Sequence, residues 1–267
     1  MSTAPAHVVL GANGVAGRET VRALLERGIT PAAVGRPYSH RVWARDWPLV
    51  VGNTIDAAIA QGTRLVYLDN VYAYGGVDGP MTEQTPVRPT SKKGVVRASA
   101  LRLLEEATAR GLSVTIGRSA DFYGPGATTS VFNGFALDKI AAGKPGTWLF
   151  DADLPHSLTY TPDIGDALAV LGTAPEAHGR TWHLPTAPAL TGREYIELAG
   201  GTTNVMGGGM MRVGAVFSSA ARETLEMAYQ YTAPYVFDSS AYETAFGVTA
   251  TPVEQGIAVT LGALPVE

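Results

Sequence analysis

A glycine-rich turn near the N-terminus constrains this chain more than any other feature. Its sequence is Gly11-Ala12-Asn13-Gly14-Val15-Ala16-Gly17, with a short apolar run before it and a helical pattern, 18–27, after it. Glycines between a strand and a helix let the backbone approach a pyrophosphate, which then faces the helix N-terminus. We therefore predict a dinucleotide-binding turn; the alternative is a glycine-rich turn that binds nothing. The expected cofactor-binding residues are Gly11, Asn13, Gly14, Val15 and Gly17.

Short apolar runs alternate with helical patterns along the chain. We expect strands at residues 7–10, 32–34, 49–51, 65–68 and 114–116, and helices at 18–27, 54–61 and 95–110. The core runs are apolar throughout, as parallel strands buried on both faces require. This alternation predicts an α/β fold, a Rossmann-type doubly wound parallel sheet with a smaller C-terminal substrate-covering region.

The fold prediction divides the chain into two parts. Residues 1–150 are expected to form the dinucleotide-binding domain, and residues 151–267 to complete the sheet and cover the substrate. Three pairs with capping-box spacing predict helix starts in the second part: Thr191 with Glu194, Ser240 with Glu243, and Thr251 with Glu254. The run 207–209 consists of glycine alone and is expected to be a flexible turn.

Charge and composition exclude several classes of function. The net charge is −4 and no long basic run is present, which argues against nucleic acid or an anionic membrane as a partner. No apolar run approaches the roughly 20 residues that span a bilayer. The chain has no cysteine, which excludes disulfides and thiolate chemistry and fits a cytoplasmic location. Its five histidines show no paired spacing on one helix, so we expect no metal site.

Two arginines indicate which dinucleotide binds. An NAD site places an acidic residue after the second strand, whereas an arginine there suits the 2′-phosphate of NADP. This chain has Arg36 at that place, and Arg18 follows the third glycine. A guanidinium makes bidentate, charge-assisted contacts with phosphate. NADP(H) is therefore the expected cofactor, although both residues could be solvated surface arginines.

Several segments together resemble the extended and atypical short-chain dehydrogenases/reductases, in their epimerase/dehydratase-like branch. Besides the glycine turn, the resemblance rests on motifs spread over almost the whole chain. These are Val66-Tyr67-Leu68-Asp69-Asn70-Val71-Tyr72-Ala73-Tyr74-Gly75, Thr82-Glu83-Gln84-Thr85-Pro86, Arg118-Ser119-Ala120-Asp121-Phe122-Tyr123-Gly124-Pro125-Gly126, Tyr160-Thr161-Pro162-Asp163-Ile164 and Trp182-His183-Leu184-Pro185.

The chain departs from this family where the chemistry is usually done. The resemblance places the catalytic serine at Asn70 or Asp69, and the tyrosine and lysine of Tyr-x-x-x-Lys at Lys93 and Arg97. It implies that Arg97 holds the ribose or phosphate of the cofactor. An unperturbed lysine, with a pKa near 10.4, is a reluctant acid at neutral pH. The segment between Arg36 and Asp69 is also short for the family, with room for about one strand–helix unit.

Three functions remain open. The pattern is similar to ketoreductases of aromatic-polyketide tailoring, of the angucyclinone type, which implies reduction of an aromatic ketone by NADPH in antibiotic biosynthesis. The proton would then come from Tyr72, Tyr123, Tyr160, Lys93, water or a hydroxyl group of the substrate. Alternatively, the chain is a sugar-nucleotide epimerase or dehydratase, although the usual base and the acidic NAD residue are missing. It could also be a non-catalytic NADP sensor or scaffold, similar to NmrA.

Candidate site residues follow from these alternatives. The catalytic candidates are Asn70, Tyr72, Lys93 and Tyr123. Asp69 lies at the carboxyl end of a strand, where ligands bind in open parallel sheets, and is a further cofactor-binding candidate. His156 lies either near the cofactor cleft or on a surface loop, and Asp163 is expected in the first turn of a helix. Aromatic residues of the C-terminal half line an apolar pocket or belong to the core: Trp148, Tyr160, Trp182, Tyr195, Tyr229, Tyr231 and Tyr235.

The cofactor prediction can be tested by replacing Arg36→Ala. Losing a charge-assisted hydrogen bond costs about 1.5–3 kcal/mol, so the Kd for NADPH should rise about ten- to a hundredfold. The Kd for NADH should barely change, because NADH has no 2′-phosphate. Fluorescence titration with both cofactors measures the two constants, and equal losses for both would show that Arg36 does not bind the phosphate.

Overall fold

The computed structural model describes residues 7–29, 32–34, 40–217 and 219–262. The strands are β1 (Val8–Leu10), β2 (Ala32–Val34), β3 (Leu65–Asn70), β4 (Val114–Ser119), β5 (Asp121–Tyr123), β6 (Gly146–Leu149), β7 (Pro155–His156), β8 (Leu158–Tyr160), β9 (Thr181–His183), β10 (Leu190–Thr191) and β11 (Thr203–Met206). The α-helices are α1 (Val15–Glu26), α2 (His40–Ala60), α3 (Lys92–Ala109), α4 (Asp138–Ala141), α5 (Thr161–Thr173), α6 (Gly192–Leu198), α7 (Gly208–Phe217), α8 (Ser219–Glu226), α9 (Ser240–Phe246) and α10 (Val253–Gly262). Short helical turns are η1 (Val71–Tyr74), η2 (Asn133–Leu137), η3 (Pro175–Ala177) and η4 (Ala228–Gln230). Within these residues no helix is long and apolar enough to cross a membrane.

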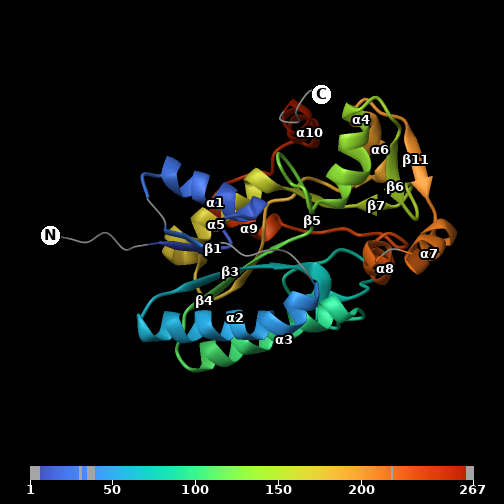
Figure 1. The fold of residues 1–267 in the computed structure, drawn as a ribbon. Helices are drawn as coiled ribbons and strands as arrows, with labels where there is room; N and C mark the ends of the chain where they lie inside the picture. Colours follow the sequence, from blue (N-terminus) through green and yellow to red (C-terminus); the bar gives the residue numbers. More distant parts are fainter. Residues whose placement is uncertain (1–6, 30–31, 35–39, 218, 263–267) are drawn as a thin grey trace.

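Parallel strands form the centre of the molecule. β1 pairs with β2, β3 pairs with β4, β4 pairs with β9, and β5 pairs with β8, all in parallel. Figure 1 shows α2 and α3 below β3 and β4, with α1, α5 and α9 on the opposite side. The predicted α/β fold with a doubly wound parallel sheet is therefore confirmed.

One predicted strand is instead part of a helix. Residues 49–51 lie inside α2, which begins at His40 and continues through Pro48, so the strand prediction was wrong. A short apolar run cannot be assigned to a strand or a buried helix from its composition alone. Here Val51 and Ile55 point toward α3, where they pack with Leu104, whereas Leu49 is exposed. The described residues between β2 and β3, 40–64, thus contain one helix and no further strand.

Helices α1 and α5 approach each other closely on the other face of the sheet. A Cβ atom at the buried Gly165 of α5 would lie 2.4 Å from the backbone carbonyl carbon of Glu19 in α1. Ala23 and Leu24 of α1 pack against Ala169 of α5. Since α1 follows the glycine turn directly, this contact fixes the direction of the turn relative to the sheet.

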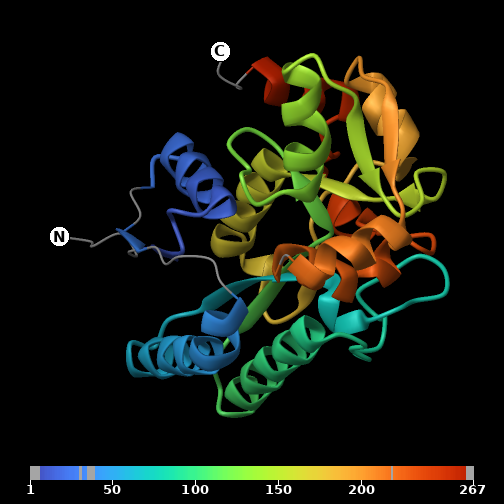
Figure 2. The same cartoon turned by 45° about the vertical axis from the view of Figure 1, so that its right-hand side comes forward.

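A second hydrophobic core lies beside the sheet and contains residues from both sides of the predicted division at residue 150. Trp148 of β6 stacks on Tyr195 of α6 at 6.0 Å and packs edge-on to Phe132. A Cβ atom at Gly192 would lie 2.2 Å from the Trp148 ring, so only glycine allows α6 to start there. In Figure 2, α4, α6, β6 and β11 form a separate group above the sheet, with the α7–α8 pair between them and α3.

Several local predictions have mixed outcomes. The capping box of Thr191 and Glu194 is confirmed at the start of α6. Ser240 is not a cap, because Ser239 takes the capping position of α9 and its hydroxyl contacts Glu243. Thr251 donates hydrogen bonds to Asp163, which lies in the first turn of α5 as expected.

Two further predictions differ from the structure. Gly208 and Gly209 begin α7, so the glycine run is not simply a turn. Residues 7–10 were expected to form a buried strand, yet Val8 and Leu10 of β1 are 61% and 52% exposed. In the part of the chain that the structure describes, β1 pairs only with β2 and lies outside the three-stranded sheet of β3, β4 and β9.

The contact between α1 and α5 generates a stability prediction. Gly165→Ala should lower the free energy of unfolding by about 1–3 kcal/mol, because the added methyl group meets backbone atoms that cannot rotate away. Gly172→Ala is the matched control, since a Cβ atom there would have no neighbour within 4 Å and alanine favours the helix. Urea denaturation measures both variants. Equal stability of the two would contradict the close approach.

Candidate functional site

The glycine turn is shaped for close backbone approach. Gly11 has a φ angle of +84°, and its carbonyl accepts a hydrogen bond of 2.8 Å from the Gly14 amide. A Cβ atom at Gly17 would lie 2.3 Å from the Gly11 carbonyl oxygen, so the turn cannot accept a side chain there. Gly14 caps α1 without a side-chain hydrogen bond, and Val15 begins the helix. The amides of the first helical turn are therefore available to an anion.

Arg18 connects this turn to a second loop. Its guanidinium donates hydrogen bonds of 3.2 Å each to the carbonyl oxygens of Asn13 and Gly126. Gly126 lies shortly before Thr129, which lines the pocket described next. Arg18 itself is exposed. Arg36, the other expected phosphate ligand, lies outside the described residues.

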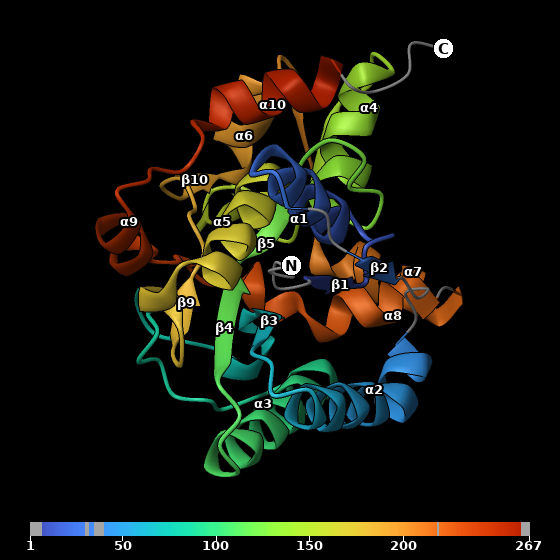
Figure 3. The same ribbon diagram turned by 90° about the vertical axis from the view of Figure 1, so that its left-hand side faces the viewer.

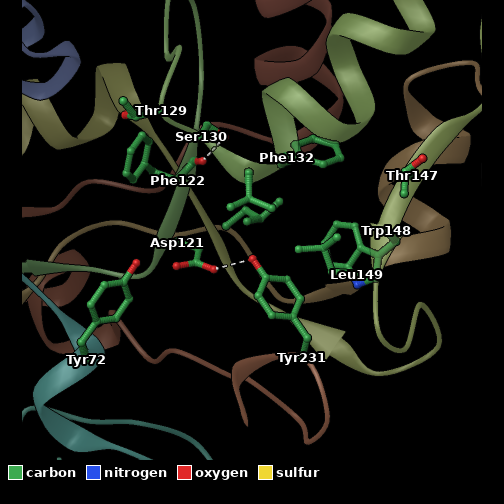
Figure 4. Close-up of a pocket in the computed structure, with 12 residues that line it drawn as sticks. Tyr72, Asp121, Phe122, Thr129, Ser130, Phe132, Thr147, Trp148, Leu149 and Tyr231 are labelled. Carbon is green, nitrogen blue, oxygen red and sulfur yellow. Dashed lines mark hydrogen bonds between the residues drawn. The ribbon is translucent and has the colours of Figure 1, made fainter. Parts of the chain in front are cut away.

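A pocket with aromatic walls lies where the β5 segment meets the second core (Figure 4). Two polar side chains, Tyr72 from η1 and Asp121 from the start of β5, point toward each other across it. The lining residues are Tyr72, Asp121, Phe122, Thr129, Ser130, Val131, Phe132, Thr147, Trp148, Leu149, Leu158 and Tyr231. Among these described residues there is one carboxylate, and there is no lysine or arginine.

The Asp121 carboxylate is held by a group of ring side chains. Its Oδ2 atom accepts a hydrogen bond of 3.1 Å from the Tyr231 hydroxyl and lies 3.2 Å from His156 Nε2. The His156 ring stacks between Tyr231 and Tyr235, at 4.7 and 4.3 Å. Burial, followed by the charge of Asp121, raises the pKa of Tyr231 well above its usual value. Tyr231 therefore stays protonated and acts as a donor to Asp121.

Asp69 forms the centre of a buried ionic network behind this pocket. Its side chain has no exposed surface, and Arg118 Nη2 and Arg97 Nη1 lie 3.0 and 3.6 Å from its oxygens. Arg118 also donates a hydrogen bond to the Tyr74 hydroxyl, which contacts His183 at 2.8 Å. Burial lowers the pKa of His183 to about 3, so this ring is neutral. These contacts join β3, β4, β9 and α3 at one end of the sheet.

The positions of the family's usual tyrosine and lysine are occupied by paired cations. The Lys93 ammonium lies 3.4 Å from Glu223 Oε2 and donates a hydrogen bond to the Glu223 carbonyl. The Arg97 side chain is 9% exposed, contacts Asp69, and lies 4.8 Å over the Trp47 ring. Both side chains therefore have protein partners, and neither lines the pocket.

The remaining catalytic candidates differ in their surroundings. Asn70 caps η1, with its Oδ1 atom accepting a hydrogen bond of 3.2 Å from the Tyr72 amide. Tyr123 is fully buried against Phe132 and Tyr160 and does not line the pocket. Burial raises the pKa of its hydroxyl far above the usual value. Of the four candidates, the structure brings only Tyr72 into the pocket.

Sequence reasoning did not single out Asp121 as a site residue. The sequence was compatible with His156 near the cofactor cleft or on a surface loop, whereas in the structure this residue is buried, with 2% of its surface exposed. The aromatic residues were expected either to line a pocket or to belong to the core. Trp148 and Tyr231 line the pocket. Tyr160, Trp182, Tyr195 and Tyr235 belong to the core. The position of Asp121, two residues after the end of the buried β4 strand, was the signal that could have found it.

The glycine turn and the parallel sheet together define an α/β protein with a dinucleotide-binding, Rossmann-type fold. The chain matches the model of the NAD dependent epimerase/dehydratase family over residues 49–184 and belongs to that family. This confirms the resemblance to the epimerase/dehydratase-like branch. No curated protein matches the chain by sequence.

Solved structures of this kind share the fold. The UDP-glucuronic acid 4-epimerase of Bacillus cereus in complex with NAD matches with a TM-score of 0.77 and 14% identity, over 97% of this chain and 98% of that one. The dTDP-glucose 4,6-dehydratase of Bacillus anthracis in complex with NAD matches with a TM-score of 0.74 and 16% identity, over 97% and 96%. The UDP-glucose 4-epimerase of Thermus thermophilus, also complexed with NAD, has a TM-score of 0.72 and 17% identity, over 97% and 98%. At these identities the likeness concerns the fold.

The buried network around Asp69 yields the next prediction. Asp69→Asn should lower the free energy of unfolding by about 3–5 kcal/mol, because two buried arginines would lose their counter-charge. Asp56→Asn is the control: its pairing with Arg110 is exposed and should contribute less than about 1 kcal/mol. Urea denaturation measures both. An Asp69→Asn variant that is fully stable but cannot bind NADPH would instead assign Asp69 to the cofactor.

Proposed function

We propose that this protein is an NADPH-dependent ketoreductase that reduces a ketone of an aromatic polyketide, of the angucyclinone type, to a secondary alcohol. The observation that carries the proposal is the pocket: aromatic and aliphatic side chains form much of its wall, hydroxyl groups of Thr129, Ser130 and Thr147 add to its lining, and Tyr72 and Asp121 point toward each other. Such a pocket suits a flat, uncharged ring system. The similarity to ketoreductases of angucyclinone tailoring, including that of simocyclinone biosynthesis, supports the same substrate class.

The glycine turn fits a dinucleotide. Gly11, Gly14 and Gly17 leave backbone room for the pyrophosphate, with the amides after Gly14 as donors. Arg18, and Arg36 by its place in the sequence, would bind the 2′-phosphate of NADP. When bound, the cofactor supplies a hydride to the carbonyl carbon of the substrate.

Tyr72 is our candidate for the group that donates the proton to the carbonyl oxygen. It lies in the pocket at the carboxyl end of β3, whereas Lys93 is paired with Glu223 and Tyr123 is buried elsewhere. Proton donation from Tyr72 converts the carbonyl oxygen, once the carbon has received hydride, into a hydroxyl group. The phenolate left on Tyr72 then regains its proton from water that enters after product release.

Sugar-nucleotide chemistry is the second candidate, because the chain belongs to the epimerase/dehydratase family. The pocket favours it less: a nucleotide diphosphate needs cations, and the described lining residues include no lysine or arginine. Turnover of UDP-glucose or dTDP-glucose with bound NAD would support this alternative. A sensor similar to NmrA would show no turnover with any substrate.

The proposed function predicts different effects for Tyr72 and Lys93. Tyr72→Phe should lower kcat for an aromatic ketone by about 10²–10⁴, the usual contribution of a positioned acid, and leave the Kd for NADPH unchanged. Lys93→Ala should lower activity only about tenfold, without a change in the shape of the pH profile. Tyr123→Phe is the tyrosine control and should keep most of the activity.

NADPH consumption with a panel of aromatic ketones measures these effects. A loss of about a thousandfold or more in Lys93→Ala, together with the disappearance of one limb of its pH profile, would make Lys93 the acid. Full activity of Tyr72→Phe would mean that the proton comes from water or from the substrate. Absence of NADPH consumption by the unaltered protein would contradict the proposed function itself.

A further inference from the structure

Asp121 is the only carboxylate among the described residues that line the pocket. Hydrogen bonds to neighbouring side chains fix its orientation. Its Oδ2 atom faces the Tyr231 hydroxyl and His156 Nε2. Its backbone amide donates a hydrogen bond of 3.1 Å to the Tyr235 hydroxyl. Main chain and side chain are thus anchored separately, so the carboxylate cannot rotate without breaking several contacts.

His156 gives this anchor its rigidity. The ring is 2% exposed and nearly parallel to the rings of Tyr231 and Tyr235, with interplanar angles of 19° and 17°. Trp148 packs edge-on against the same ring at 5.5 Å. A histidine enclosed in this way presents Nε2 to Asp121 in one direction only.

The second oxygen of Asp121 faces the pocket. In Figure 4 the Oδ2 atom meets Tyr231, while the other oxygen points across the pocket toward Tyr72. An ionised carboxylate accepts about four hydrogen bonds, and burying it among aromatic rings is costly unless donors surround it. Asp121 therefore favours a ligand that brings a hydrogen-bond donor and disfavours one that brings a negative charge.

We propose that Asp121 is a specificity-determining residue that accepts a hydrogen bond from a hydroxyl group of the substrate. The substrate class is then an uncharged, hydroxylated aromatic ketone, and aromatic acids and phosphates are rejected. This proposal rests on the proposed function, since it concerns the same pocket. It adds the chemical group that the pocket selects.

The test compares three small ligands of one shape: 6-hydroxy-1-tetralone, 1-tetralone, and 6-carboxy-1-tetralone. Calorimetry measures their Kd values in the presence of NADP⁺, so that no turnover is needed. The unaltered protein should bind the hydroxyl compound about tenfold or more tighter than 1-tetralone, because the hydrogen bond involves a charged acceptor. It should bind the carboxylate compound least tightly. Equal affinity for all three, or tightest binding of the carboxylate, would overturn the proposal even without a variant.

Asp121→Asn should remove this discrimination. The preference for the hydroxyl compound should fall below about threefold, and the carboxylate compound should gain affinity. Unchanged binding of 1-tetralone shows that the variant keeps its pocket. Asp153→Asn, which removes an exposed carboxylate paired with Arg193, is the matched control and should keep the full order of affinities. Preferences that persist in Asp121→Asn would refute the role of this residue.

Binding and turnover separate the two proposals. Discrimination by Asp121 without NADPH-dependent reduction of any ketone would support this inference and contradict the proposed function. Reduction of aromatic ketones by a protein that binds the three ligands equally would support the proposed function and contradict this inference.

Discussion

The rest of the structure depends on the ion pairs between the buried carboxylate of Asp69 and two arginines. Asp69 stands at the end of β3, and the two guanidinium groups beside it come from α3 and β4. Through Tyr74, the same network reaches His183 at the end of β9. Figure 3 shows β9, β4 and β3 next to one another, with α3 below them. The segments that carry Tyr72 and Asp121 leave the sheet from the end at which Asp69 lies.

The chemistry of the pocket follows from where those segments go. η1 begins directly after β3 and is capped by Asn70, which places Tyr72 on one side of the pocket. β5 begins two residues after β4 ends and places Asp121 on the other side. The second core supplies Trp148 and Tyr231. The parallel strands thus position the polar groups, and the second core, which includes residues of β5 and β8, closes the aromatic wall around them.

The sequence predicted the fold class and the glycine turn because both depend on local patterns. Alternating apolar runs and glycines between a strand and a helix retain their meaning without knowledge of distant contacts. The strand prediction for residues 49–51 was wrong because the burial of this run depends on packing against α3, which lies far away in the sequence. The Asp121 group was missed for the same reason: Asp121, His156 and Tyr231 are spread over more than a hundred residues, and no spacing rule connects them.

The charge distribution of the pocket has a consequence for how its ligands respond to ionic strength. At an ionic strength of 0.1 M, dissolved salt largely screens the attraction between an exposed guanidinium such as Arg18 and a phosphate when the two are more than about 10 Å apart. An uncharged ligand enclosed by Phe132, Trp148 and Tyr231 experiences no such long-range attraction, and exclusion of its surface from water strengthens in sulfate or phosphate solutions. On the proposed function, therefore, added sulfate weakens cofactor association and strengthens substrate association, so the two occupancies change in opposite directions.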